Sequence, residues 1–188
     1  MERPMLYFPR DVEWYDWLLS NHNQYPKGVL LIFYKLENKQ PTMRWEEAVK
    51  VALCFGWIDS TVKSLGNGKR QQLFTPRNRK STWSALNKSY IKELKTNNLI
   101  HESGLKMIIL AKESGTWAAM DDAENMVIPE ALQKAFDVNS DAFKFYRSLS
   151  PGYKKSYLRW IASGKREETK QKRISEIIRL CTLQKKSR

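Results

Sequence analysis

The amino-acid sequence predicts an α+β fold, in which a small, mostly antiparallel sheet is packed with helices and followed by a C-terminal helical region. Three observations support this prediction. Strand-like and helix-like segments alternate in the first half of the chain, the Asn67-Gly68 dipeptide is typical of a hairpin turn, and the last third shows only helical periodicity. We expect a core domain over residues 1–113, a linker over 114–128 and the helical region over 129–188.

A helix and a strand are expected first. Residues 10–21 are predicted to be helical because Val12, Tyr15 and Leu19 recur at helical spacing, with Trp14 and Leu18 widening the stripe. Residues 29–35 form an apolar run of strand length. An uninterrupted run of this kind is typical of a strand that is covered on both faces.

The central segment predicts a helix, a hairpin and a second helix. Thr42 is expected to cap a helix that runs to about Phe55, where Gly56 suits the left-handed conformation that ends helices. The hairpin strands are then residues 57–65 and 69–75, because a two-residue Asn-Gly turn favours positive φ at both positions. A helix capped by Ser81 and another over about residues 102–112 complete the core domain.

The last third predicts four helices. The first starts near Pro129, the second spans residues 141–149, and the third has Ser150 as its cap, Pro151 at its first position and Gly164 at its end. The last helix spans residues 167–183, with an apolar stripe at helical spacing that consists of Ile174, Ile177, Ile178 and Cys181.

The net charge of +13 is concentrated in two blocks. Residues 62–95 carry 9 basic and 1 acidic side chains, and residues 150–188 carry 12 basic and 3 acidic ones. Such blocks attract anionic partners, such as nucleic acid or an acidic protein, although they also serve solubility alone. The candidate anion-binding patch consists of Lys69, Arg70, Arg79, Lys80, Lys170, Lys172 and Arg173.

Polar and aromatic residues that could bind a ligand are dense between Trp45 and Asn87. Asp59 follows Ile58 in a strand, so the two side chains face opposite sides of the sheet. Arg77 follows the hairpin, where it either pins the loop through an ion pair with Asp59 or Glu47, or binds an anionic ligand. The candidate ligand-binding residues are Glu47, Asp59, Lys63, Arg77, Ser81, Trp83 and Asn87. For Trp83 the alternative is core packing, and for Asn87 it is a structural hydrogen bond.

No general catalytic motif is present, so we favour a function other than catalysis and assign no catalytic residues. The sequence has no Gly-x-Ser-x-Gly elbow and no phosphate-binding glycine loop. The histidines, His22 and His101, stand apart, and Cys54 and Cys181 lack metal-type spacing, so neither a metal nor a cofactor is expected. We expect both thiols to be buried and free, and we expect a cytoplasmic protein without a transmembrane segment or a secretory signal. The oligomeric state is not indicated.

Several longer stretches resemble the YdeI/OmpD-associated, or bacteriocin-protection, family. They are Trp45-Glu-Glu-Ala48, Ala52-Leu-Cys-Phe-Gly-Trp-Ile-Asp-Ser60, Phe74-Thr-Pro-Arg77, Ser81-Thr-Trp-Ser84 with Asn87, Tyr157-Leu-Arg-Trp-Ile161, Gly164-Lys-Arg-Glu-Glu-Thr-Lys170 and Lys172-Arg-Ile174. The chain departs from the family pattern mildly, at Gly164 and Lys170. The resemblance implies a core like the YjbR/CyaY superfamily and a link to bacteriocin tolerance or envelope stress, but no known activity.

Three classes of function follow from these observations. The first is a non-catalytic module that binds an anionic partner, which the charge blocks favour. The second is a small-molecule pocket or an enzyme built around Glu47, Asp59, Arg77 and Asn87. The third is a protein–protein role linked to stress or immunity.

Overall fold

The computed structural model describes residues 3–186, and it confirms the α+β class. The chain divides into two compact units, Met1–Trp117 (unit 1) and Ala118–Arg188 (unit 2). The boundary lies within the segment that the sequence predicts as a linker, and Trp117 packs against the core of unit 1. Among the described residues, no helix has the length and apolarity needed to cross a bilayer.

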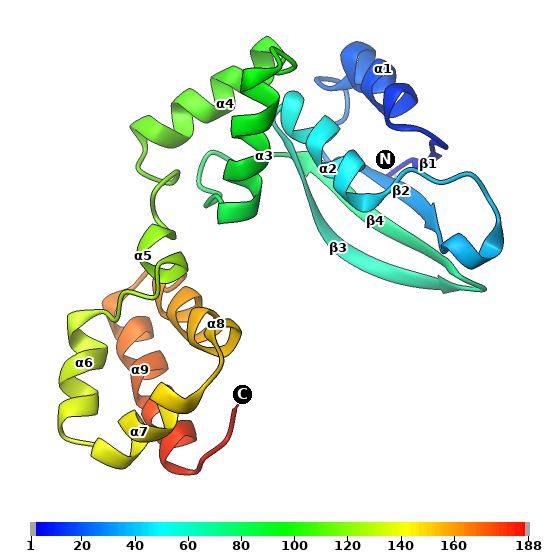
Figure 1. Cartoon of the computed structure of the whole chain (residues 1–188). Helices are drawn as coiled ribbons and strands as arrows, with labels where there is room; N and C mark the ends of the chain where they lie inside the picture. The colour runs from blue at the N-terminus through cyan, green and yellow to red at the C-terminus, as the bar shows by residue number, and fades with distance from the viewer. Residues whose placement is uncertain (1–2, 187–188) are drawn as a thin grey trace. The chain divides into compact units, whose positions relative to one another are not determined.

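Unit 1 contains a four-stranded sheet in the order β1-β2-β4-β3 (Figure 1). Its central and hairpin strands pair antiparallel, as the sequence predicts, whereas β1 pairs parallel with β2. The edge strand β1 was not predicted. The bounds are β1 Met5–Tyr7, β2 Val29–Tyr34, β3 Trp57–Gly66 and β4 Lys69–Pro76.

The hairpin turn between β3 and β4 has the predicted geometry. Asn67 and Gly68 both have positive φ, at 48° and 68°. Such a turn matches the right-handed twist of the two strands that it joins. The pairing is then shifted twice by irregularities, between Asp59 and Val62 and between Ser64 and Gly66.

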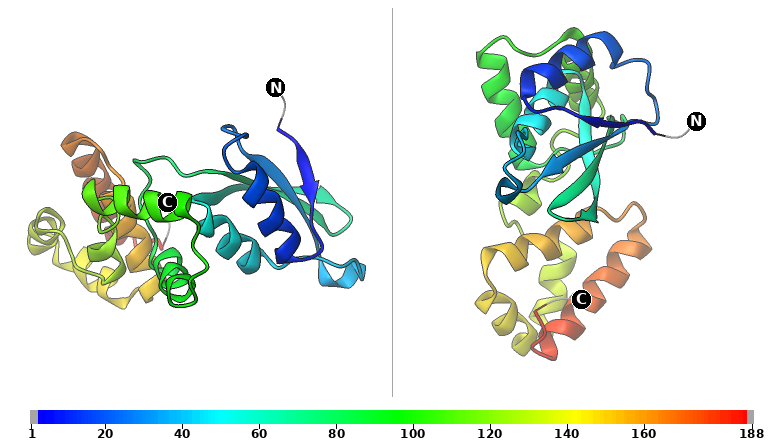
Figure 2. Two further views of the ribbon diagram at one scale, coloured as in Figure 1. Left: turned by 90° about the horizontal axis from the view of Figure 1, so that it is seen from above. Right: turned by 90° about the vertical axis from the view of Figure 1, so that its right-hand side faces the viewer.

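Two helices, α1 (Asp11–Asn21) and α2 (Trp45–Cys54), cover one face of the sheet (Figure 2). Trp14 of α1 joins the two helices by donating from Nε1 to the Ala48 carbonyl of α2 at 3.2 Å, and its ring lies 5.9 Å from that of Phe74 in β4. Val29 and Leu31 of β2 alternate toward the same core and are fully buried. On the opposite face of β2, Ile32 is buried and Leu30 and Tyr34 are half-buried, so the prediction of a strand covered on both faces is confirmed in part.

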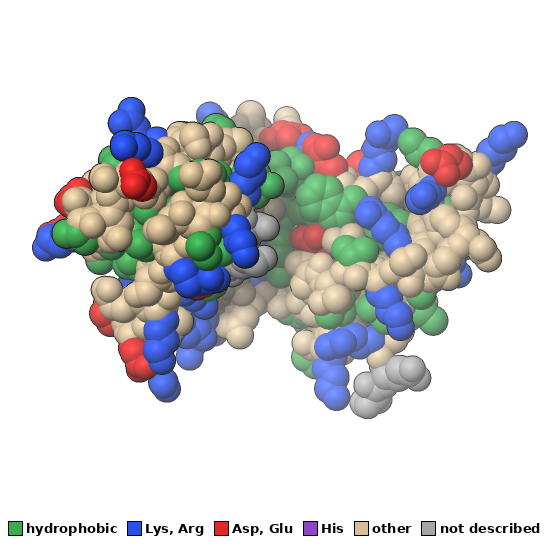
Figure 3. All heavy atoms as spheres, turned by 90° about the horizontal axis from the view of Figure 1, so that it is seen from below, with side chains coloured by type: hydrophobic (Ala, Val, Ile, Leu, Met, Phe, Trp, Pro, Cys, Tyr) green, Lys and Arg blue, Asp and Glu red, His purple; other side chains and the backbone are tan. Residues whose placement is uncertain are grey.

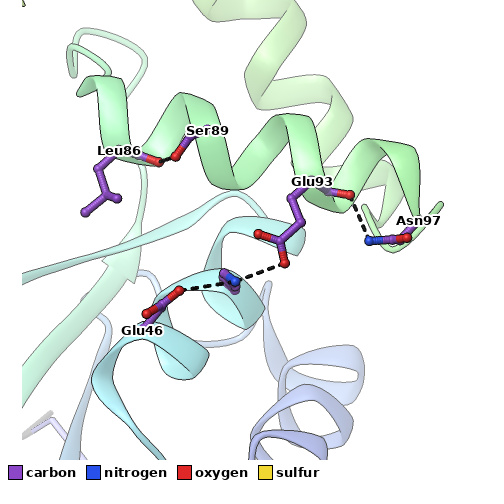
Figure 4. Close-up of polar contacts among 6 residues, drawn as sticks. Glu46, Leu86, Ser89, Glu93 and Asn97 are labelled. Atoms are coloured by element: carbon purple, nitrogen blue, oxygen red, sulfur yellow. Dashed lines mark hydrogen bonds and ion pairs between the residues drawn. The ribbon is translucent and has the colours of Figure 1, made fainter.

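Helices α3 (Ala85–Thr96) and α4 (Glu102–Glu113) pack against α2. Lys50 of α2 connects α2 to α3, because its Nζ lies 3.2 Å from Glu46 and 2.9 Å from Glu93 of α3 (Figure 4). The start of α4 lies on the end of α2, where the His101 amide donates to the Cys54 carbonyl at 3.0 Å.

Two predicted helix caps are wrong. The cap of α2 is Arg44, because the hydroxyl of Thr42 accepts instead from the Tyr34 amide of β2. The cap of α3 is Ser84, whose Oγ accepts from the Asn87 amide at 3.2 Å, and Ser81 lies in the preceding turn. The buried stripe of α1 also differs from the prediction: Trp14 and Leu18 are buried, whereas Val12 and Leu19 are about half exposed.

Unit 2 is helical. Its core includes Leu132, Phe136, Leu158 and Ile177, all at most 1% exposed. The segment predicted as an unstructured linker contributes a short helix, whose Glu124 receives two hydrogen bonds from Arg159 at 2.7 and 2.8 Å. The helices are α5 Asp121–Glu124, α6 Glu130–Asp137, α7 Ser140–Ser148, α8 Pro151–Ala162 and α9 Glu167–Thr182.

Candidate functional site

Asp59 is the centre of a polar cluster on the helix-covered side of the sheet. Its Oδ2 accepts a hydrogen bond from Trp45 Nε1 at 2.9 Å and another from Gln72 Nε2. The three residues come from β3, the start of α2 and β4, and Gln72 is 2% exposed. Asp59 therefore fixes the indole ring of Trp45 at the point where α2 begins.

Arg77 lies in the interior near Asp59 and is 6% exposed. Its guanidinium carbon is 3.8 Å from the centre of the Trp83 ring, and its Nη2 donates to the Thr82 carbonyl at 2.8 Å. Within residues 3–186 its Nε and Nη1 have no hydrogen-bond partner, nor does Oε1 of Gln72. Burial lowers the pKa of Arg77 to about 10, while the charge of Asp59 acts in the opposite direction.

Arg77 pins the loop, as one of the two predicted roles has it, but it does so without the predicted ion pair. Among the described residues it forms no ion pair with Asp59 or Glu47, and its guanidinium is covered rather than open to a ligand. It packs on Trp83, which in turn lies against Trp117 with 4.9 Å between the ring centres. Arg77 thus holds the segment after the hairpin in place.

The remaining predicted ligand-binding residues make no side-chain hydrogen bond or ion pair with Asp59 or Arg77 within residues 3–186. Glu47 accepts from the Arg44 amide at 2.7 Å and so serves its own helix end. Lys63 is exposed on β3, Ser81 lies in the loop before α3, and Asn87 is in the first turn of α3. Among the described residues of the predicted set, the contacts and charges given above connect Asp59, Arg77 and Trp83, and Trp45 and Gln72 join them.

A cleft with a volume of about 710 Å³ opens beside the Asp59 cluster. The short helix η1 (Leu36–Asn38) contributes to its wall, and Asn38 Nδ2 ties that wall to the hairpin turn by donating to the Asn67 carbonyl at 2.7 Å. The cleft is lined by Phe33, Tyr34, Lys35, Leu36, Thr42, Met43, Arg44, Trp45, Glu46, Val62, Ser64, Gly66, Asn67, Gly68, Lys69 and Arg70.

The cleft combines positive charge with aromatic rings. Four of its lining residues are basic and one, Glu46, is acidic. The guanidinium carbon of Arg70 lies 5.3 Å from the centre of the Phe33 ring, and Lys69 Nζ lies 5.8 Å from that of Tyr34. Lys69 and Arg70 are therefore placed beside aromatic rings, and neither has an acidic partner within residues 3–186. Figure 3 shows one face of the molecule, on which Lys and Arg side chains occur over both units and hydrophobic side chains reach the surface among them.

The predicted anion-binding patch is divided between the two units. Lys69 and Arg70 line the cleft, and Arg79 and Lys80 are exposed in the loop that follows β4. The other three lie on α9 with partners nearby: Lys170 and Lys172 pair with Glu167 and Glu168 at 3.7 and 2.6 Å, and Arg173 donates to Ser163 Oγ at 2.8 Å. The unpaired basic groups of the predicted patch are thus those of unit 1, within the part of the chain that the structure describes.

The histidines are not isolated in the fold. His22 and His101 lie with their ring centres 5.0 Å apart, and Phe55 packs against both. The proximity was not predicted, because the residues are 79 positions apart in the sequence. Within residues 3–186 no group of three His, Cys, Asp or Glu side chains gathers in a way that could hold a metal ion.

Both cysteines are buried free thiols, and we expect them to resist modification in the folded protein. Burial raises the pKa of Cys54 to about 12 and that of Cys181 to about 11, so neither forms the reactive thiolate near neutral pH. Because the unfolded thiols ionise from about pH 9, the free energy of unfolding should fall as the pH rises above that value. A disulfide reagent added at pH 8 should label no thiol before denaturation and two after it. Rapid labelling of the native protein would contradict the burial.

Comparison with known proteins gives two matches to family models. Residues 125–182 match the family described as "Bacteriocin-protection, YdeI or OmpD-Associated", so the resemblance predicted for nearly the whole chain is confirmed for its C-terminal part. Residues 6–107, which include the motifs between Trp45 and Asn87, match a different model. The kinship with YjbR/CyaY-like proteins stays a prediction. Searches of curated proteins and of solved structures found no match. The match over residues 6–107 covers more than half of the 188-residue chain, so the chain belongs to the family described as "Domain of unknown function (DUF8412)".

Proposed function

We propose that unit 1 binds single-stranded nucleic acid in the cleft formed by the hairpin, η1 and the start of α2. The observation that carries the proposal is the placement of Trp45, whose indole is fixed by Asp59 in a cleft that also contains Arg44 and Arg70. Proteins that bind single strands combine aromatic rings, on which bases stack, with cations that follow the phosphates. Both groups are present here in one cleft.

The size and charge of the cleft support a nucleotide-sized ligand. Its volume of about 710 Å³ lies in the range of small-ligand pockets, which is roughly 300–1,000 Å³. A single base with its sugar and phosphate is of this scale, whereas a duplex keeps its bases stacked inside. Arg44 and Arg70 are exposed, so they reach phosphates without losing an existing ion pair among the described residues.

The set of Glu47, Asp59, Arg77 and Asn87 supports no second proposal, because none of the four is among the residues that line the cleft and Glu47 accepts from the amide at the start of its own helix. A cytoplasmic location and a link to bacteriocin tolerance or envelope stress belong to the same proposal. The free buried cysteines support the location. The description of the family that residues 125–182 match supports the link.

The binding test uses a fluorescently labelled single-stranded oligonucleotide of twelve nucleotides, titrated with the full chain at low and moderate salt. The double variant Arg44→Gln/Arg70→Gln should bind about 10- to 100-fold more weakly, because two charged contacts are lost. The slope of log K against log salt should also fall by about 1.4 in magnitude, since each lost contact to a single strand removes roughly 0.7.

The matched control is Lys134→Gln/Lys144→Gln, which removes the same charge from exposed positions of unit 2 and should leave binding unchanged. The proposal fails if the oligonucleotide does not bind at low salt, or if the control variant loses as much affinity as the cleft variant. Equal binding of poly-glutamate would identify an acidic protein surface as the partner and would also reject the nucleic-acid proposal.

A further inference from the structure

A second groove of unit 1 lies between α3 and α4 and has an apolar lining. Its volume is about 390 Å³. Two of the lining residues are strongly exposed for their type: Leu105 at 41% and Ile109 at 55%. Amphipathic helices normally turn such side chains toward a core, so their presence in an open groove indicates a binding surface. The lining residues are Lys88, Ile91, Lys92, Lys95, Leu105, Ile108, Ile109, Lys112 and Trp117.

All of the charged residues that line the groove are lysines. Lys88, Lys92 and Lys95 of α3 are spaced by four and three residues, which places them on one side of the helix over about 10 Å. Lys112 of α4 lies with Nζ 5.6 Å from the centre of the Trp117 ring. Lys92 and Lys95 have no ion-pair partner among residues 3–186. Their charges are therefore available to a ligand.

We propose that this groove binds an acidic amphipathic helix of a partner protein. A helix lays its apolar face into such a groove through anchors at i, i+3, i+4 and i+7. Carboxylates flanking those anchors recur at the same spacing as the lysines of α3, so the charges pair along the length of the groove. The apolar anchors of the partner helix would contact Leu105, Ile108 and Ile109.

The distribution of charge excludes the other ligands of similar chemistry from this proposal. An acyl chain has one anionic end, whereas Lys92 and Lys95 of α3 and Lys112 of α4 line the groove from both helices and exceed what that end can use. A nucleic-acid strand carries charges at regular spacing but has no apolar side chains for Leu105 and Ile109. By contrast, an acidic amphipathic helix presents both carboxylates and apolar side chains at regular intervals along its length.

The test uses a labelled synthetic helical peptide that carries leucines at i, i+3, i+4 and i+7 flanked by glutamates, titrated into the full chain. Ile109→Glu should weaken binding by tenfold or more, because a carboxylate then faces the apolar side of the peptide. Lys92→Glu/Lys95→Glu should weaken it similarly, and a peptide with lysines in place of its glutamates should bind this variant more tightly than it binds the wild type. Ile109 is half exposed and the two lysines are exposed, so folding is preserved.

The matched control is Lys106→Glu, which reverses an exposed charge on α4 outside the groove and should leave peptide affinity unchanged. The proposal is overturned if the wild-type chain binds dodecanoate but not the peptide, or if Ile109→Glu leaves peptide affinity unaltered. It is also overturned if the double lysine variant loses oligonucleotide binding and keeps peptide binding. Because the oligonucleotide is expected in the other cleft, the peptide should bind without displacing it, and either proposal can fail alone.

Discussion

Replacing Gly104 with alanine is expected to destabilise unit 1 by about 3 kcal/mol or more, although the same change in most helices is stabilising. Gly104 lies in the first turn of α4, where an added Cβ would be 2.2 Å from the Cys54 carbonyl oxygen and 2.8 Å from its carbon. That oxygen is already held by the His101 amide at 3.0 Å. Because the obstacle is backbone, no rotation of a side chain can relieve the contact.

Two further contacts prevent α4 from moving away to make room. Ser103 Oγ donates to the Phe55 carbonyl at 3.1 Å, and the left-handed Gly56 packs against Met107 of α4. Moving α4 would disrupt both contacts and uncover Ile108 and Ala111, which belong to the core. The expected cost is therefore that of overpacking a rigid site. The helical preference for alanine over glycine, roughly 1 kcal/mol, offsets only a small part of this cost.

Urea unfolding followed by tryptophan fluorescence measures this effect, because six of the seven tryptophans lie in unit 1. Gly152→Ala is the control. A Cβ there would meet nothing closer than Ser150 Oγ at 3.9 Å, so its unfolding free energy should be unchanged or raised by up to about 1 kcal/mol. An unchanged midpoint for Gly104→Ala would mean that α4 does not rest on the end of α2.

The features that sequence predicted well are those decided by a few adjacent residues. The hairpin follows from Asn67-Gly68, because both residues tolerate the positive φ that the turn imposes. Gly56 ends α2 for the same reason, with φ at 73°. Pro151 begins α8 because its missing amide has no partner at a helix start in any case.

Features that depend on distant partners were missed. The strand β1 is three residues long and exists through pairing with β2, which no local period reveals. Several residues of the segment Ser81-Thr-Trp-Ser84 have hydroxyl groups that could cap α3, and tertiary contacts determine which of them does so. Arg77 binds the Thr82 carbonyl and stacks on Trp83, which keeps these residues extended until Ser84.

The Asp59 cluster could be predicted only in part, because the hairpin contains two irregularities. A regular hairpin without irregularities, counted back from the Asn67-Gly68 turn, would pair Asp59 with Pro76. The observed register pairs Asp59 with Phe74. The shift brings Asp59 within hydrogen-bonding distance of Gln72. Bulges of this kind have no signature in a single sequence, so neither Gln72 nor the contact with Trp45 was anticipated.

Replacing Asp59 with alanine is expected to destabilise unit 1 by about 3 kcal/mol. The change removes the acceptor of Trp45 Nε1 and Gln72 Nε2, and a hydrogen bond to a charged group contributes roughly 1.5–3 kcal/mol. Gln72 is buried and its Oε1 already has no partner within residues 3–186, so its amide cannot turn to water. The buried guanidinium of Arg77 also loses the nearby negative charge that favours it.

Arg77→Met should by contrast cost only about 1 kcal/mol, the contribution of the lost hydrogen bond to the Thr82 carbonyl. Burying a guanidinium with two unpartnered nitrogens is itself unfavourable, and an apolar chain of similar length also packs on Trp83. A double-mutant cycle by urea unfolding then isolates the coupling. In the Asp59→Ala background, Arg77→Met should restore part of the lost stability, since it removes the uncompensated charge. Asp59→Asn, which keeps an acceptor for Trp45, should be less destabilising than Asp59→Ala. Zero coupling in the cycle would show that Asp59 acts on Trp45 and Gln72 alone, so that its charge does not serve Arg77.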